Sequence, residues 1–125
     1  MRIFGIESSC DETALALVLK ASDHVEIEKS VLASQVKTHA RFGGVVPEVA
    51  AREHAEHLFP LLEEIGVSRD GDGIDAIAVT IGPGLIPALR IGVELGKSLA
   101  WAWGKPLVGV NHLEGHVYSV WAEGS

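Results

Sequence analysis

Two histidines near the end of the chain have the spacing of a metal-binding pair. His112 and His116 stand four residues apart in the string HLEGH. If the segment is helical, residues four apart lie on one face, so both imidazoles can reach one ion. Glu114 lies about 200° round such a helix from His112 and therefore points away from that face. A zinc site needs three or four ligands, so the pair predicts an incomplete site, with two ordinary surface histidines as the alternative.

A second group of reactive side chains forms a short polar stretch after the first apolar segment. The stretch from Ser8 to Thr13 reads SSCDET. Small hydroxyl residues in a tight hairpin can direct hydroxyl and backbone N–H groups at a phosphate. The acidic pair Asp11 and Glu12 could hold a magnesium ion or act as a base. The same residue types also form plain solvated turns, so both interpretations stay open at this point.

Two further patterns give weaker signals. His54 and His57 also lie about one helical turn apart, but the charged residues around them are typical of an ordinary helix surface. The string Gly82-Pro83-Gly84 could hold an anion at a helix N-terminus, or it could simply connect two elements. It lacks the lysine of a phosphate-binding loop and the spaced glycines of a dinucleotide-binding fold.

The composition predicts a single folded domain. The chain has 125 residues, of which 47% are hydrophobic, enough to bury a core and to argue against disorder. Its formal net charge of −7 is unlike that of a free-standing nucleic-acid binder, which is usually basic. Cys10 is the single cysteine, so no internal disulfide can form, which fits the cytoplasm. We expect neither a signal peptide nor a membrane span.

The positions of these side chains depend on an expected order of three strands followed by alternating helices and strands. Strands linked by short turns should pair antiparallel, and strands joined through helices should pair in parallel by right-handed crossovers. This order predicts an α/β, ribonuclease-H-like lobe with a mixed five-stranded sheet of order 3-2-1-4-5 and helices on both faces. We expect strands at 2–8, 13–20, from residue 25, 74–81 and 106–111, and helices at 47–65, 85–103 and 112–123.

Several details of the helices also follow from their residues. Pro47 suits the first turn of the helix at 47–65, and Gly66 should close it. The apolar side of the helix at 85–103 should be formed by Ile86, Leu89, Val93, Leu95 and Leu99. Pro60 lies inside the first helical pattern and should kink it. Gly92 and Gly96 stand four apart in the second helix, where they should allow a close approach of neighbouring elements.

Four strings in the chain resemble the TsaD family, whose older name is O-sialoglycoprotein endopeptidase or glycoprotease. The strings cover nearly the whole chain and stand in the family's order: ESSCDET, SQVKTHARFGGVVPEVAAREH, GPGL after a strand, and HLEGH. The resemblance implies a tRNA N6-adenosine threonylcarbamoyltransferase. Such an enzyme transfers a threonylcarbamoyl group from its adenylate to N6 of adenosine 37, and it uses ATP or threonylcarbamoyl-adenylate.

The resemblance also implies roles for particular residues. His112 and His116 match the family's two metal-binding histidines, with zinc or iron as the metal. Asp11 matches an acidic residue important for activity, and Glu12 lies beside it. Ser9 and Cys10 match the family's phosphate-facing turn. The string GGVVPE matches a loop that lies near the same cleft.

The family pattern further implies that the chain is one lobe of two. Family members are more than twice as long and carry the third metal ligand and most of the adenine pocket in a second lobe. We therefore expect 1–125 to form a single N-terminal lobe that is inactive alone. The implied partners are tRNA and TsaB-like and TsaE-like proteins, and we expect the lobe to self-associate through 47–65 and 85–103. Pro87 and Arg90 depart from the pattern and should interrupt a helix that is usually small and apolar there.

Three other functions compete with this interpretation. The old name suggests a metallopeptidase, but the zinc-peptidase pattern places its glutamate directly after the first histidine, unlike Glu114. A non-catalytic, TsaB-like interaction module would share the lobe, although that paralogue lacks the H-x-E-G-H string. A sugar or acetate kinase lobe normally begins its first-strand motif with aspartate, where this chain has Glu7.

Overall fold

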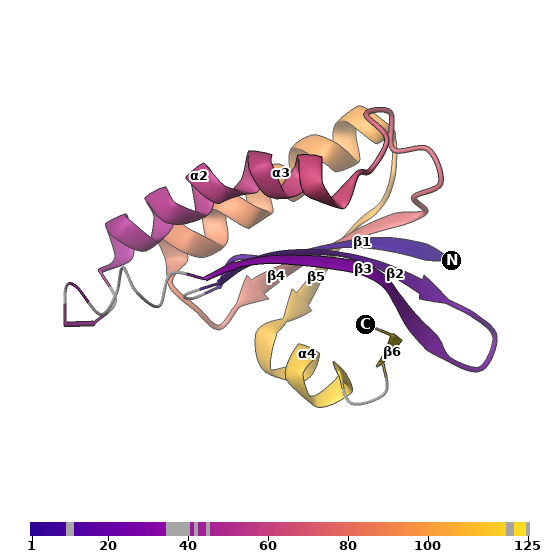
Figure 1. Ribbon diagram of the computed structural model, residues 1–125, viewed down its shortest axis with the longest axis horizontal. Helices are drawn as coiled ribbons and strands as arrows, with labels where there is room; N and C mark the ends of the chain where they lie inside the picture. The colour runs from indigo at the N-terminus through magenta and orange to yellow at the C-terminus, as the bar shows by residue number, and fades with distance from the viewer. Residues whose placement is uncertain (10–11, 35–40, 42, 45, 120–121, 125) are drawn as a thin grey trace.

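The computed structural model describes residues 1–9, 12–34, 41, 43–44, 46–119 and 122–124. A single mixed sheet forms its centre, with helices packed on both faces (Figure 1). The elements are β1 Arg2–Glu7, β2 Glu12–Lys20, β3 Val25–Ser34, α2 Pro47–Ile65, β4 Ala76–Gly82, α3 Ile86–Trp103, β5 Leu107–Asn111, α4 His112–Tyr118 and β6 Ala122–Gly124.

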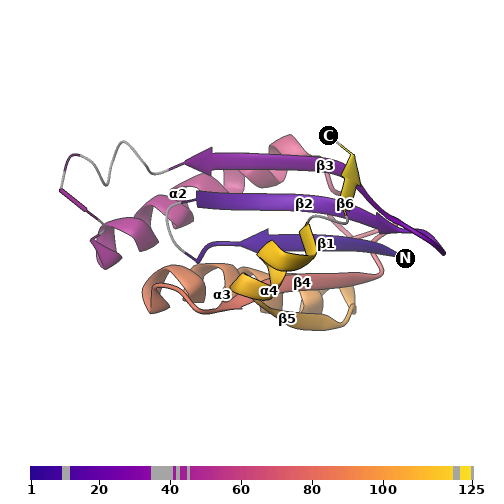
Figure 2. The ribbon, with the colours of Figure 1, turned by 90° about the horizontal axis from the view of Figure 1, so that it is seen from below.

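The order of the strands confirms the predicted sheet and extends it by one strand. The observed order is β5-β4-β1-β2-β3-β6, which contains the predicted 3-2-1-4-5 (Figure 2). The meander β1-β2-β3 is antiparallel, whereas β4 runs parallel to β1 and β5 runs parallel to β4. β1 therefore lies inside the sheet, between an antiparallel and a parallel neighbour.

The core lies between the sheet and the helices α2 and α3. Because side chains alternate across a strand, Phe4 of β1 and Leu15 of β2 face the same side, and both are buried there. The ring of Phe4 also meets that of Trp103 edge to face, with centroids 5.9 Å apart. The helix α2 contributes the buried residues Ala50, His54, Leu58, Leu61 and Ile65.

The helix α2 has the bounds that the sequence predicted. Pro47 lies in its first turn, where a missing N–H leaves no hydrogen bond unmade. The helix continues through Pro60 and ends at Gly66, which has the left-handed φ of 75°. No helix in the described part of the chain is long and apolar enough to cross a membrane.

The helix α3 packs through small residues, which corrects part of the prediction. We expected Ile86 on its apolar side, but that residue is 73% exposed. Gly92 and Gly96 are buried, and a side chain at Gly92 would lie within 2.4 Å of the Ser8 hydroxyl. The two glycines therefore bring α3 close to the sheet. Pro87 lies in the first turn of α3, so it does not interrupt the helix, contrary to our expectation.

The last predicted helix is too long. We expected it to span 112–123, but α4 ends at Tyr118 and the chain then forms β6. β6 pairs in parallel with the first residues of β3, from Val25 to Ile27. The outer edge of β3 offers unpaired backbone groups, and a seven-residue helix containing Gly115 has little intrinsic stability to compete with that pairing.

Candidate functional site

Three neighbouring parallel strands have their carboxyl ends along one edge of the sheet, and a polar side chain lies at or near the carboxyl end of each strand. Glu7 is the last residue of β1, Thr80 lies near the end of β4, and His112 directly follows β5. β1, β4 and β5 are parallel neighbours, so their carboxyl ends meet. Figure 2, seen from below, shows α4 in front of β1 and β4, and Figure 1 shows it on the face of the sheet opposite α2 and α3.

The histidine pair converges because α4 begins at His112 itself. The Asn111 side chain accepts hydrogen bonds from the backbone N–H groups of Leu113 and Glu114, at 2.9 and 3.1 Å, and this cap fixes the start of the helix. His112 and His116 then lie one turn apart. Their Nε2 atoms are 3.0 Å apart, and their ring planes meet at 89°. Two nitrogens directed at one point make a partial metal-binding set.

Glu7 holds the other nitrogen of His112, a contact that the sequence analysis missed. Its Oε2 lies 3.0 Å from His112 Nδ1 and accepts a hydrogen bond from the Thr80 hydroxyl at 2.8 Å. The backbone N–H of Ser9 donates to Oε1. Burial of Glu7 opposes ionisation, but the hydrogen bonds from these three partners outweigh burial and lower the pKa of its carboxyl.

One sequence signal could have identified Glu7. It is the acidic residue that ends the otherwise largely apolar strand RIFGIE, and the carboxyl end of a central strand is where a site in such a sheet forms. Thr80 carries no comparable signal, since threonine is an ordinary strand residue.

The turn after β1 is held in place by the segment between β4 and α3. The hydroxyl of Ser9 lies 3.1 Å from His112 Nδ1. The carbonyl of Ser9 accepts the N–H of Leu85 at 2.9 Å, and a side chain at Gly84 would lie 2.6 Å from that carbonyl oxygen. Ser8 donates to the carbonyl of Ala88 in α3. The glycine-proline-glycine segment therefore supports Ser9, and its binding of an anion stays a prediction.

Four of the six predicted site residues meet at this edge of the sheet. Ser9 contacts His112, and Glu12 and His116 line the same hollow of about 240 Å³. Cys10 and Asp11 lie outside the described residues, as does much of the segment 35–45. In the part of the chain that the structure describes, no three His, Cys, Asp or Glu side chains form a metal-binding group. The hollow is lined by Glu7, Glu12, Thr80, Val110, Asn111, His112, Gly115 and His116.

His54 and His57 lie elsewhere, on α2. His54 is fully buried and its Nδ1 lies 2.6 Å from the hydroxyl of Thr13. Nε2 of His57 lies 3.5 Å from Glu53. The contact of His54 with Thr13 ties α2 to β2, and the contact of His57 with Glu53 lies within α2. Neither histidine lines the hollow beside α4.

A family model and several curated sequences match the chain. The model is described as TsaD, tRNA N6-adenosine threonylcarbamoyltransferase, and it matches residues 26–125. A protein of that same name from Moorella thermoacetica is 52% identical over 120 residues, covering 94% of this chain and 34% of the relative. One from Bacillus licheniformis is 54% identical over 119 residues, with the same two coverages. The chain thus spans about a third of the length of these curated relatives.

Solved structures share the fold at low sequence identity. YeaZ from Pseudomonas aeruginosa superposes with a TM-score of 0.57 and 23% identity, covering 88% of this chain and 43% of that one. RuvC from Thermus thermophilus superposes with a TM-score of 0.52 and 12% identity, covering 89% of this chain and 64% of that one. Together with the strand order, these likenesses confirm the predicted ribonuclease-H-like fold class.

Proposed function

The chain belongs to the TsaD family of tRNA N6-adenosine threonylcarbamoyltransferases, and from this premise we propose that it forms the N-terminal half of such an active site. The whole reaction would transfer a threonylcarbamoyl group from its adenylate to N6 of adenosine 37 in tRNA. Because tRNA is the proposed substrate, the proposed compartment is the cytoplasm.

One observation supports this proposal most strongly. The strings ESSCDET and HLEGH stand about a hundred residues apart, yet their side chains touch. Both Glu7 and Ser9 contact Nδ1 of His112, at 3.0 and 3.1 Å. A contact between two separate strings of the family pattern is what a shared active site requires, whereas unrelated surface turns need no such contact.

We propose that His112 and His116 hold a divalent cation, zinc or iron, through their Nε2 atoms. The donor set fits this role, because the two nitrogens face one another and Glu7 occupies the far nitrogen of His112. An outer carboxylate of this kind commonly accompanies a metal-binding histidine. When bound, a divalent cation would act as a Lewis acid toward a carbamate or phosphate oxygen.

The acidic residues of the turn are proposed to act on the nucleophile. The exocyclic amine of adenosine is a weak nucleophile, and it must lose a proton as the new bond forms. Glu12 lines the hollow beside His112 and His116, which supports the proposal that its carboxylate accepts that proton. Asp11 is proposed to share this work. Ser9 and Cys10 are proposed to face the phosphate of the adenylate.

The exposed face of α2 and α3 is proposed to bind partner proteins. Phe59 of α2 is 73% exposed and Trp101 of α3 is 85% exposed, and we propose that both belong to a contiguous apolar patch of the kind that marks an interaction surface. We propose that a TsaB-like lobe or a second copy of this chain docks there, and that a TsaE-like protein joins the assembly. Light scattering of the isolated chain should show dimers at high concentration, and a strict monomer would contradict self-association.

The proposed activity can be tested by transplanting the lobe. A chimera would carry this chain in place of the matching third of the Bacillus licheniformis relative. It would receive tRNA, threonine, bicarbonate, ATP and the adenylate-forming enzyme, with digestion of the tRNA to detect the modified nucleoside. We expect product from the chimera, none from its His112→Ala variant, and product from the control His57→Ala. A folded but inactive chimera beside an active parent would refute the proposal.

The isolated chain is expected to give no product in the same assay. It supplies two metal ligands and a turn, but the opposing wall of the site must come from elsewhere. Water would then fill the hollow and screen the electrostatic contribution to catalysis. The net charge of −7 also disfavours binding of tRNA without further positive surface. Turnover by the isolated chain would show that this lobe suffices.

A further inference from the structure

We propose that Glu7 is a positioning residue that fixes the proton of His112 on Nδ1 and leaves its Nε2 lone pair directed at His116. The inference rests on the proposed metal site, because it explains how one of the two ligands is held ready for a cation. It concerns the tautomer of His112 and can be measured without any metal.

The hydrogen-bond inventory of the site favours this tautomer, because the Ser9 hydroxyl, 3.1 Å from the same Nδ1, can accept or donate, whereas a carboxylate can only accept. A carboxylate offers only acceptors, and a neutral imidazole offers one donor and one acceptor. The 3.0 Å contact from Glu7 Oε2 to His112 Nδ1 is therefore a hydrogen bond only if Nδ1 carries the proton. Nε2 is then the acceptor nitrogen, which is the form in which histidine binds a metal.

The facing histidine completes the arrangement. Since Nε2 of His112 carries no proton, the 3.0 Å contact with His116 Nε2 places a proton on the His116 nitrogen. A cation that binds both Nε2 atoms would take the place of that proton. Glu7 thus assigns different roles to the two rings in the metal-free protein: His112 is ready to bind, and His116 must first release or move a proton.

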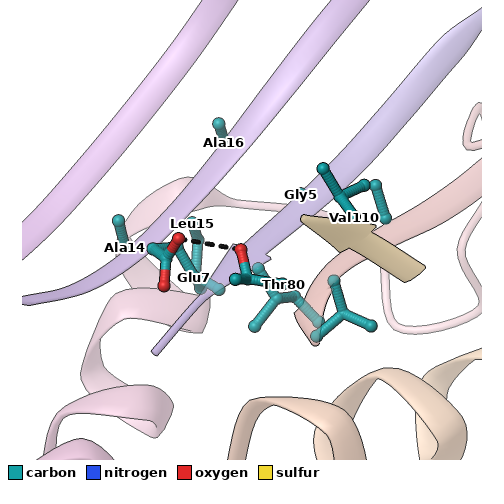
Figure 3. Close-up of a pocket in the computed structure, with 10 residues that line it drawn as sticks. Gly5, Glu7, Ala14, Leu15, Ala16, Thr80 and Val110 are labelled. Atoms are coloured by element: carbon teal, nitrogen blue, oxygen red, sulfur yellow. Dashed lines mark hydrogen bonds between the residues drawn. The ribbon is translucent and has the colours of Figure 1, made fainter. Parts of the chain in front are cut away.

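The register of β1 against β4 places Glu7 beside Thr80 and so orients its carboxylate. Ile6 of β1 pairs with Val79 of β4, so the next residues, Glu7 and Thr80, are neighbours. Figure 3 shows their side chains pointing toward one another, joined by the hydrogen bond. The Thr80 hydroxyl donates to the same oxygen that faces His112, and Ser9 N–H holds the other oxygen. The carboxylate is thereby fixed on both sides and aimed at Nδ1.

The site is sheltered enough for this orientation to matter. The side chains of His112 and Glu7 are 23% and 31% exposed, so water competes only partly for their hydrogen bonds. A freely exposed ring would adopt the tautomer that histidine favours in water, with the proton on Nε2. Glu7 is the group that opposes that preference.

The test is to read the His112 tautomer by NMR in the full chain with ¹⁵N-labelled histidine. The parent should show a protonated Nδ1 and an unprotonated Nε2 at His112. Glu7→Gln should shift the ring toward the Nε2–H form, because glutamine can also donate to Nδ1. The matched control is Glu53→Gln, which makes the same change beside His57 and should leave His112 unaltered. A Glu7→Gln protein in which His112 keeps its Nδ1 proton would overturn the inference.

Zinc titration of the same proteins separates this inference from the proposed metal site. Glu7→Gln should weaken zinc binding by about 10–100-fold, the range for outer partners of metal ligands, and Glu53→Gln should not. If the parent failed to bind zinc, the metal site would be wrong while the tautomer measurement still decided the role of Glu7. If Glu7→Gln fails to fold, the near-isosteric Thr80→Val is the second variant. It removes the hydrogen bond to Glu7 Oε2 and should shift the His112 tautomer in the same direction. An unchanged tautomer in Thr80→Val would contradict the inference.

Discussion

The two histidine pairs of the chain have similar spacing but lie in opposite surroundings. On α2, His54 is buried in the core against Thr13, and Nδ1 of His57 is buried with no hydrogen-bond partner among the described residues. On α4, His112 and His116 direct their Nε2 atoms at one another across 3.0 Å, beside an open hollow. Spacing brings two rings to one side of a helix, but the neighbouring strands decide whether they serve packing or chemistry.

The difference arises from where each helix lies on the sheet. The helix α2 lies along the core face, so a ring on its inner side meets β2 and is enclosed. The short helix α4 lies on the opposite face, at the edge where parallel strands end, so its rings meet polar residues and solvent (Figure 1). Variants that alter one pair and leave the other intact test this distinction.

The largest expected effect is on stability, at His54. His54→Ala should lower the free energy of unfolding by about 2–4 kcal/mol, because it opens a cavity in the core and leaves the buried Thr13 hydroxyl without this partner. Urea denaturation measures the change. Zinc binding by the folded variant should be unchanged. If His54→Ala were as stable as the parent but had lost zinc binding, the pair on α2 would be the metal-binding pair and our assignment would be wrong.

The next effect is on metal binding, at His116. His116→Ala should weaken zinc binding by at least about 10–100-fold, or roughly 1.4–2.7 kcal/mol, because a ligand is removed. Its exposed position should keep the change in unfolding free energy within about 0.5 kcal/mol. Zinc titration followed by the NMR signals of both rings measures this, with His57→Ala as the control. Equal zinc affinity in the variant and the parent would show that His112 and His116 do not form a metal site.

A smaller effect is expected at the glycine that brings α3 against the site turn. Gly92→Ala places a methyl group 2.4 Å from the Ser8 hydroxyl, which should destabilise the fold by about 1–2 kcal/mol despite the better helix propensity of alanine. The matched control is Gly115→Ala in α4, where nothing lies within 4 Å. That change should stabilise slightly. Thermal unfolding of both variants checks the contrast, and equal shifts would contradict it.

The smallest effect is expected at His57. His57→Leu removes the buried Nδ1 that lacks a partner among the described residues and adds apolar area, so stability should rise by up to about 1 kcal/mol. Zinc binding should stay as in the parent. A loss of more than about 1 kcal/mol in urea denaturation would show that His57 makes a contact important to the fold.

The sequence predicted the local elements better than the contacts between them. Alternating apolar residues and turn signals predicted β1 to β5, and the proline and glycine at its ends predicted α2. The short strand β6 was missed because pairing with the edge of β3 creates it, and nothing in its own residues signals a strand. The helical period of α3 was predicted correctly, but Ile86 was assigned to the wrong face. The face that packs on the sheet is the one that carries the small residues Gly92 and Gly96.

The site was predictable in part for the same reason. Spacing placed His112 and His116 on one side of a helix, and the resemblance joined them to the turn after β1. The carboxylate that orients His112 was not predicted, since the contact depends on the register of β1 against β4 and on the path of β5. A single sequence gives no direct signal of register between distant strands.

The contacts of Glu7 connect very distant parts of the chain. Glu7 and Thr80 are 73 residues apart, and Glu7 and His112 are 105 apart. Contacts of such separation require long loops to close, which costs entropy, so we expect them to form late in folding. A cation bound at His112 would therefore stabilise the native state more than the folding transition state. It would lengthen the lifetime of the folded lobe without speeding its formation.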